Sequence, residues 1–142
     1  MTQLVEYSGE RAYYLERGVG RPLLPARITD PRSGRFTDRL LLVDSGADVC
    51  AVPVLVLRSI GIELEGLPRV RSGGTAGAID ALEVDLRFEV CDVAVTARTL
   101  VPLADGFRTC ILGRDPFFRL LHFGFQQFED ETQNRVLWRP GG

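Results

Sequence analysis

Residues 40–48 combine residue types that could do acid–base chemistry. The four branched aliphatic residues at 40–43 predict a buried strand, and Asp44 follows them directly. A carboxylate at the end of a hydrophobic strand is expected where water is scarce, so its ionisation is costly and open to tuning. Ser45 can hydrogen-bond locally, and Gly46 permits a tight turn and the close approach of a ligand. Asp44, Ser45 and Gly46 are therefore candidate catalytic residues.

Three segments of the chain together carry a family resemblance. Asp-Ser-Gly-Ala occupies residues 44–47, Arg-Ser-Gly-Gly-Thr-Ala-Gly-Ala residues 71–78, and Cys-Ile-Leu-Gly-Arg-Asp residues 110–115. In order and spacing they resemble the active-site loop, the glycine-rich flap and the hydrophobic-hydrophobic-Gly segment of the retropepsin-like aspartic proteases, the dimeric retroviral type. The resemblance extends over residues 23–138. Asp-Ser-Gly alone is common in turns, so the specificity lies in the combination.

The resemblance implies an aspartic endopeptidase, whose chemistry needs two carboxylates around one water. One carboxylate takes the proton of the water while the other polarises the substrate carbonyl. Two like charges so close share one proton over a range of pH. The sequence has no second Asp-Ser-Gly or Asp-Thr-Gly, and Asp105-Gly106, which lacks the hydroxyl residue, predicts a turn. The pair is therefore expected to form from Asp44 of two chains across a two-fold axis, leaving a lone monomer inactive.

The resemblance also implies roles for the residues around Asp44. Ser45 would hold the two loops of the dimer in register, and the Gly46 carbonyl would accept a substrate N–H. Asp48 would bind substrate backbone and pair with Arg114. The expected substrate-binding residues are Leu42, Ala47, Asp48, Gly73, Gly74, Thr75, Ala76, Gly77, Ile111 and Arg114. The expected partners are a second copy of the chain and an extended peptide, and neither a metal nor an organic cofactor is implied.

Other readings of these residues remain open at this stage. Asp44 could support a turn, the pair of Asp48 and Arg114 could be a structural salt bridge, and residues 73–77 could form an ordinary hairpin loop. The whole chain could be a retropepsin-fold dimerisation or peptide-binding module with little or no proteolysis, or a β-barrel scaffold without a peptide groove. A thiol protease pairing Cys50 with His122 is disfavoured because no orienting group or oxyanion feature accompanies it.

Composition narrows the classes of function. The chain has 142 residues, 45% of them hydrophobic and 25% charged, with a net charge of −2. All 17 basic residues other than the single histidine are scattered arginines, which disfavours nucleic acid or an anionic membrane as a partner. Three widely spaced cysteines in apolar surroundings predict buried thiols in a reducing compartment. With no signal-peptide pattern or membrane-length apolar run, we expect a cytoplasmic protein, and the initial Met1 hints at a freestanding one.

Strand patterns dominate the chain. Residues 23–29 and 36–43 predict a hairpin around the turn at 30–34, and residues 82–90 alternate apolar with charged, with 93–101 as their hairpin partner. Short helices are expected at 53–60, with Pro53 in the first turn and Gly61 at the end, and at 115–121, with Asp115 as N-cap. Strands are expected at 122–128 and 136–138.

These patterns predict an all-β fold, a small closed β-barrel of the retroviral aspartic protease type with one or two short helices. Residues 23–142 would form this domain. Residues 1–22 would be an N-terminal extension, in which 4–15, together with 136–138, are candidates for strands of a dimer sheet.

Overall fold

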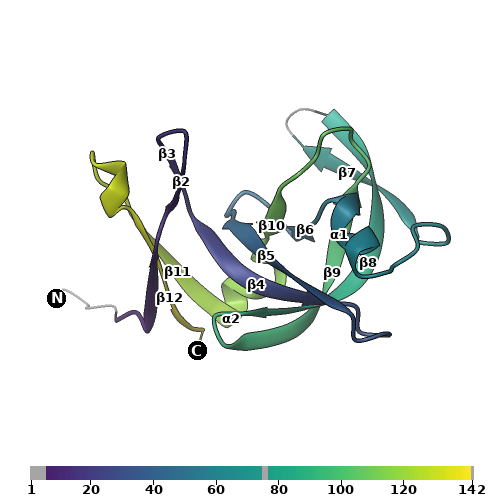
Figure 1. The fold of residues 1–142 in the computed structure, drawn as a ribbon, viewed down its shortest axis with the longest axis horizontal. Helices are drawn as coiled ribbons and strands as arrows, with labels where there is room; N and C mark the ends of the chain where they lie inside the picture. The colour runs from purple at the N-terminus through teal and green to yellow at the C-terminus, as the bar shows by residue number, and fades with distance from the viewer. Residues whose placement is uncertain (1–5, 75–76, 142) are drawn as a thin grey trace.

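Six strands close into a barrel at the centre of the molecule (Figure 1). In the computed structural model, which describes residues 6–74 and 77–141, 54% of the chain is strand and 12% helix. The barrel order is β4 (Leu23–Thr29), β5 (Phe36–Val43), β10 (Cys110–Leu112), β6 (Cys50–Ala51), β9 (Val93–Pro102) and β8 (Gly77–Val90). Three residue pairs between β8 and β4 complete the ring. The predicted closed, mostly β barrel with two short helices is confirmed.

The two predicted hairpins of the barrel are present. β4 and β5 have the expected bounds, and their turn is held by Asp30, whose carboxylate accepts hydrogen bonds from the Arg32 backbone N–H and the Ser33 hydroxyl. β8 and β9 pair over ten positions, from Ala81↔Pro102 to Val90↔Val93. Between them Cys91 and Asp92 both have positive φ, as a two-residue type I′ turn requires. Burial alternates over the last part of β8, from Asp85 to Val90, so this part of the strand has one wet face as predicted.

The two helices differ slightly from expectation at their starts. α1 (Val54–Ser59) begins after Pro53, which is the N-cap and not part of the first turn, and Gly61 follows its end with a φ of +75°. α2 (Arg114–Leu120) follows Gly113, but regular helical geometry begins only at Pro116, so Asp115 has the extended backbone of the predicted N-cap. Asp115 is extended (φ −101°, ψ 121°) because its N–H donates to the Asp48 carbonyl at 2.9 Å, and its carboxylate pairs with Arg119.

A separate three-stranded sheet joins the two ends of the described chain. Its order is β1 (Gly9–Ala12), β12 (Arg135–Pro140) and β11 (Leu121–Gln126), with the 3-10 turn η1 (Glu131–Gln133) between the last two. β2 (Tyr14–Glu16) and β3 (Val19–Arg21) form a small hairpin of their own, which projects at the upper left of Figure 1. Part of the expected N-terminal extension is thus strand that pairs with β12 of its own chain.

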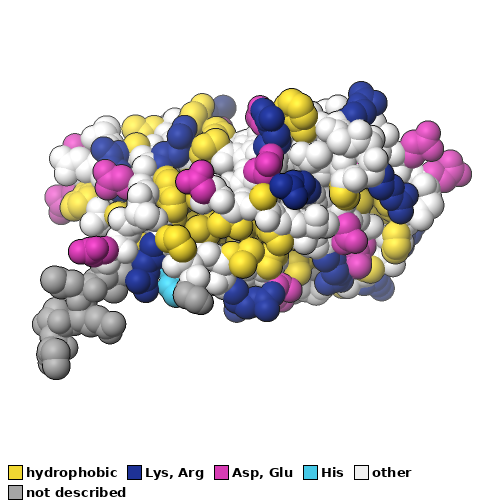
Figure 2. Space-filling model, turned by 90° about the horizontal axis from the view of Figure 1, so that it is seen from below, with side chains coloured by type: hydrophobic (Ala, Val, Ile, Leu, Met, Phe, Trp, Pro, Cys, Tyr) yellow, Lys and Arg dark blue, Asp and Glu magenta, His cyan; other side chains and the backbone are white. Residues whose placement is uncertain are grey.

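The hydrophobic core fills the barrel and reaches α2. Among its fully buried side chains, Phe88 of β8 and Phe117 of α2 pack edge to face with ring centroids 5.7 Å apart. Figure 2 shows hydrophobic side chains along the middle of one face, with arginine and acidic side chains around them. Within the described residues no helix is long and apolar enough to cross a membrane.

The contact between Phe88 and Phe117 predicts a large stability difference between two phenylalanine substitutions. Phe117→Ala should lower the free energy of unfolding by about 3–5 kcal/mol, because it leaves a cavity between α2 and the barrel. Phe128→Ala, at a side chain that is 49% exposed, should change it by less than about 0.5 kcal/mol. Urea unfolding at one protein concentration measures both. Equal losses would mean that α2 does not share the barrel core.

Candidate active site

The loop between β5 and β6 holds Asp44 in a defined position. The Asp44 carboxylate accepts a hydrogen bond from the Gly46 N–H at 2.8 Å, and the Asp44 carbonyl accepts one from the Ala47 N–H at 3.2 Å. Asp44 is half-buried, while Ser45 and Gly46 are exposed. The loop therefore presents one oriented carboxylate beside two small residues that a second molecule can reach.

This loop is anchored by β10, which lies between β5 and β6. β10 pairs parallel with β5, Leu112 opposite Val43, and antiparallel with β6, Ile111 opposite Ala51. The Leu112 carbonyl accepts a hydrogen bond from the Asp44 N–H at 3.2 Å. The chain crosses so closely here that a Cβ added to Gly113 would come 2.2 Å from the Val49 carbonyl carbon. The hydrophobic-hydrophobic-Gly segment thus contacts the Asp44 loop at both ends, through Leu112 at Asp44 and through Gly113 at Val49.

Asp48 and Arg114 lie together as the sequence predicted. The Arg114 guanidinium donates to the Asp48 carboxylate, and the Arg114 N–H donates to the Ala47 carbonyl at 2.9 Å. Both side chains are more than half exposed, so the ion pair itself contributes little to stability. The backbone bond from Arg114 to Ala47 joins the far end of the Asp44 loop to the start of α2, and the Asp48 carboxylate lies at the surface.

An apolar row runs from Asp44 across four neighbouring strands. Leu42 of β5 is opposite Ile111 of β10, Ile111 is opposite Ala51 of β6, and Ala51 is opposite Leu100 of β9. All four are half-buried, whereas their chain neighbours Leu41, Val43, Cys50, Val52, Thr99, Val101, Cys110 and Leu112 are buried. The two predicted pocket residues, Leu42 and Ile111, are therefore adjacent on the outer face.

Sequence reasoning missed Ala51 and Leu100 as members of this row. Neither has a distinctive neighbour pattern, and their place beside Ile111 depends on strand register over long separations. The row continues to Glu83 of β8, opposite Leu100. A hydrogen bond from the Arg98 side chain lowers the pKa of Glu83 below its usual value, so the row ends in a charged pair.

The predicted flap is a hairpin of β7 (Arg69–Gly74) and β8. The pairs Gly73↔Ala78 and Gly74↔Gly77 end the described part of this hairpin, at the upper right of Figure 1. Gly77 has a φ of +105°, a conformation that favours glycine. Thr75 and Ala76 lie outside the described residues. The glycine-rich hairpin thus extends beyond the end of β9, which pairs with β8 only from Ala81↔Pro102 onward.

The cysteines do not form a catalytic centre. Cys50 is buried, its Sγ accepts a hydrogen bond from the Gly113 N–H at 3.4 Å, and burial raises its thiol pKa to about 11. His122 is exposed on β11, where its ring nitrogen contacts the Arg139 side chain, whereas Cys50 is buried in the barrel.

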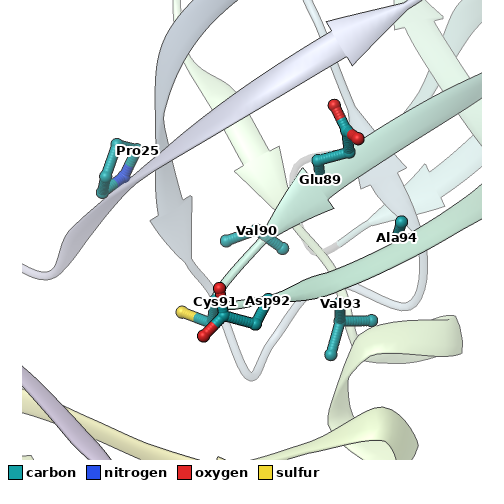
Figure 3. A pocket seen from close by; sticks show the side chains of 7 residues that line it. All are labelled: Pro25, Glu89, Val90, Cys91, Asp92, Val93 and Ala94. Atoms are coloured by element: carbon teal, nitrogen blue, oxygen red, sulfur yellow. The ribbon is translucent and has the colours of Figure 1, made fainter.

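A pocket of about 390 Å³ lies at the β8–β9 turn (Figure 3). It contains Cys91, whose thiol pKa is raised to about 12 by burial and by Asp92. The Glu89 carboxylate points away from that thiol, and the nearby Asp92 carboxylate raises the thiol pKa, which disfavours the reactive thiolate.

Comparison with known proteins leaves the family open. No model of a known protein family matches the chain, and no curated protein sequence matches it significantly. Among the described residues, no group of three or more His, Cys, Asp or Glu side chains could hold a metal ion. Membership of the retropepsin-like family therefore stays a prediction from the three sequence segments.

The close crossing at Gly113 predicts that this glycine is irreplaceable. Gly113→Ala should lower the free energy of unfolding by about 1–3 kcal/mol, because its Cβ meets backbone atoms of Val49 and Cys50. Gly73→Ala, at a position with open space, should change it by less than about 0.5 kcal/mol. Thermal or urea unfolding of both variants tests this. A fully stable Gly113→Ala protein would show that β10 can move away from the loop.

The raised thiol pKa values predict that the folded protein resists alkylation. At about pH 8 the thiols of Cys50, Cys91 and Cys110 should be protonated, because burial raises each pKa, to about 11, 12 and 11 respectively. Iodoacetamide should label them slowly when folded, faster as the pH rises toward these values, and rapidly in urea. Mass spectrometry counts the labels. Rapid labelling of folded Cys50 at pH 8 would contradict its buried position.

Proposed function

We propose that the protein is a homodimeric aspartic endopeptidase. The observation that carries the proposal is the placement of Asp44: a half-buried carboxylate, fixed by the Gly46 N–H, on an exposed loop at the end of the apolar row. A carboxylate held this way is suited to general acid–base work on a peptide laid across Leu42 and Ile111. The three sequence segments add the expectation of a retropepsin-like enzyme.

Two chains are needed because one loop supplies one carboxylate. In the proposed dimer the two Asp44 side chains hold a water between them and share one proton. The ionised carboxylate takes a proton from the water as its oxygen attacks the scissile carbonyl carbon, and the protonated one gives its proton to the carbonyl oxygen. The carboxyl group that is now protonated gives its proton to the amide nitrogen while the other carboxylate takes a proton from one hydroxyl of the intermediate. The C–N bond breaks, the carboxylic acid and amine products leave, and the pair again holds one proton. No covalent enzyme intermediate forms.

The surroundings of Asp44 support an extended peptide as substrate. The half-buried apolar row provides surface for alternate side chains, and the exposed Asp48 carboxylate and Gly46 carbonyl can accept backbone N–H groups. The β7–β8 hairpin would close over the peptide and exclude water. The free thiols of Cys50, Cys91 and Cys110 fit a reducing, cytoplasmic location.

The proposal predicts that one substitution abolishes peptide cleavage. Asp44→Asn should lower cleavage of a mixed peptide library by at least about 10²–10⁴-fold, because the amide cannot take the water proton. Its side-chain oxygen can still accept the Gly46 N–H, so the fold should be kept. Asp105→Asn, in the turn between β9 and β10, is the matched control and should cleave as the wild type does. Mass spectrometry from about pH 4 to 7 detects products.

The wild-type rate should fall faster than linearly on dilution, because only the dimer is active. Equal cleavage by wild type and Asp44→Asn would reject Asp44 as the catalytic group. The wild type could instead be dimeric by sedimentation and cleave no peptide, with the Asp44→Asn variant behaving in the same way. That result would favour the non-proteolytic dimerisation or peptide-binding module.

A further inference from the structure

A small groove lies between residues 11–14, where β1 leads into β2, and the outer face of the β4–β5 hairpin. It has a volume of about 270 Å³ and is lined by Arg11, Ala12, Tyr13, Tyr14, Leu23 and Leu40. Tyr14 is 53% exposed and Leu40 is 40% exposed, so large apolar surface faces solvent here. One wall comes from residues before Leu23, which the resemblance to aspartic proteases does not cover. The groove is thus a feature of this chain and not one that the three segments predict.

The groove is continuous with the apolar row at Asp44. Leu23 pairs with Leu42, a member of that row, and Pro25 pairs with Leu40. Residues opposite each other in register lie on the same face of the sheet, and so do alternate residues of one strand. Leu42 and Leu40 therefore lead along the outer face of β5 from Asp44 to the groove. Four residues of strand span about 13 Å, the length of about four residues of an extended peptide.

The groove is held in place from several sides. Tyr13 is buried in the core between β1 and β2, and its N–H donates to the Asn134 carbonyl at 3.0 Å. The Gly20 N–H donates to the Glu131 carboxylate at 3.2 Å, which ties the β2–β3 hairpin to η1. Because this wall is already ordered, it can bind a side chain without a further loss of conformational entropy.

Size and charge indicate what the groove holds. Its volume is below the roughly 300–1,000 Å³ of pockets for drug-sized molecules, which fits one large side chain better. Its six lining residues fall short of the roughly 20–30 residues that each side of a stable dimer interface needs. Arg11 is exposed and is the charged residue of the lining, and in the described part of the chain it forms no ion pair. A negative charge on the occupant would complement it.

We propose that this groove is an outer subsite for the substrate peptide. It takes a bulky apolar side chain about four residues from the scissile bond, packed on Tyr14, Leu23 and Leu40, with an adjacent Asp or Glu reaching Arg11. The proposal rests on the proposed function, since it assigns the peptide that crosses Asp44. A two-fold dimer carries two such grooves, so the same preference applies on both sides of the scissile bond.

Peptide selection tests the groove separately from cleavage. Ten-residue peptides with Leu at both central positions and random residues elsewhere are equilibrated with the Asp44→Asn protein, and the retained peptides are sequenced. We expect bulky apolar residues next to Asp or Glu to be enriched about 10-fold at the fourth residue from the centre. Adding Leu40→Ser should remove the apolar enrichment, and adding Arg11→Gln should remove the acidic one. Phe36→Ser, on the same face of β5 beyond the groove, is the control and should keep both.

Each alternative outcome overturns a different statement. No retained peptide, or the same selection in all variants, would show that the groove is not a substrate site. Weaker dimerisation of Leu40→Ser by sedimentation, with an unchanged selection, would show that a second copy of the chain covers it. If selection changes as expected but wild type cleaves none of the retained peptides, the endopeptidase proposal fails and the groove stands. Cleavage without any outer preference rejects the groove alone.

Discussion

The insertion of β10 between β5 and β6 is the constraint on which the candidate site depends. Cys110, Ile111 and Leu112 pair parallel with the end of β5, and a parallel neighbour must come from a distant part of the chain. This pairing lets the Leu112 carbonyl accept the Asp44 N–H and brings Gly113 against Val49. The position of the Asp44 loop is therefore set by packed backbone, which leaves little freedom for the carboxylate.

Because of the same crossing, the ion pair of Asp48 and Arg114 beside the loop contributes little to the loop's stability and geometry. Asp48 and Arg114 are exposed, and exposed ion pairs stabilise a fold by roughly 0–1 kcal/mol. The backbone bonds around them, from the Arg114 N–H to Ala47 and from the Asp115 N–H to Asp48, fix the geometry without the side chains. The Asp48 carboxylate can thus turn toward a ligand while the loop keeps its shape.

Local patterns in the sequence predicted the elements that depend on neighbours in the chain. The alternation in residues 82–90 and the turn residues at 30–34 predicted β8 and the β4–β5 hairpin, because side-chain period and turn chemistry act over short distances. The bond from the Asp115 N–H to the Asp48 carbonyl was not predicted, because no local pattern reveals that contact. Ala51 and Leu100 were missed for the same reason, since register across β6 and β9 is a long-range property.

The pairing of β1 with β12 has a consequence for biosynthesis. Gly9 lies opposite Trp138, so β1 is synthesised long before its partner β12. At about 5–20 residues per second, roughly 6–25 seconds separate the two strands. The β2–β3 hairpin can form at once from its own turn, but β1 beside it waits with unpaired backbone for that time. The part of the groove wall contributed by β1 is therefore completed only after β12 has been made.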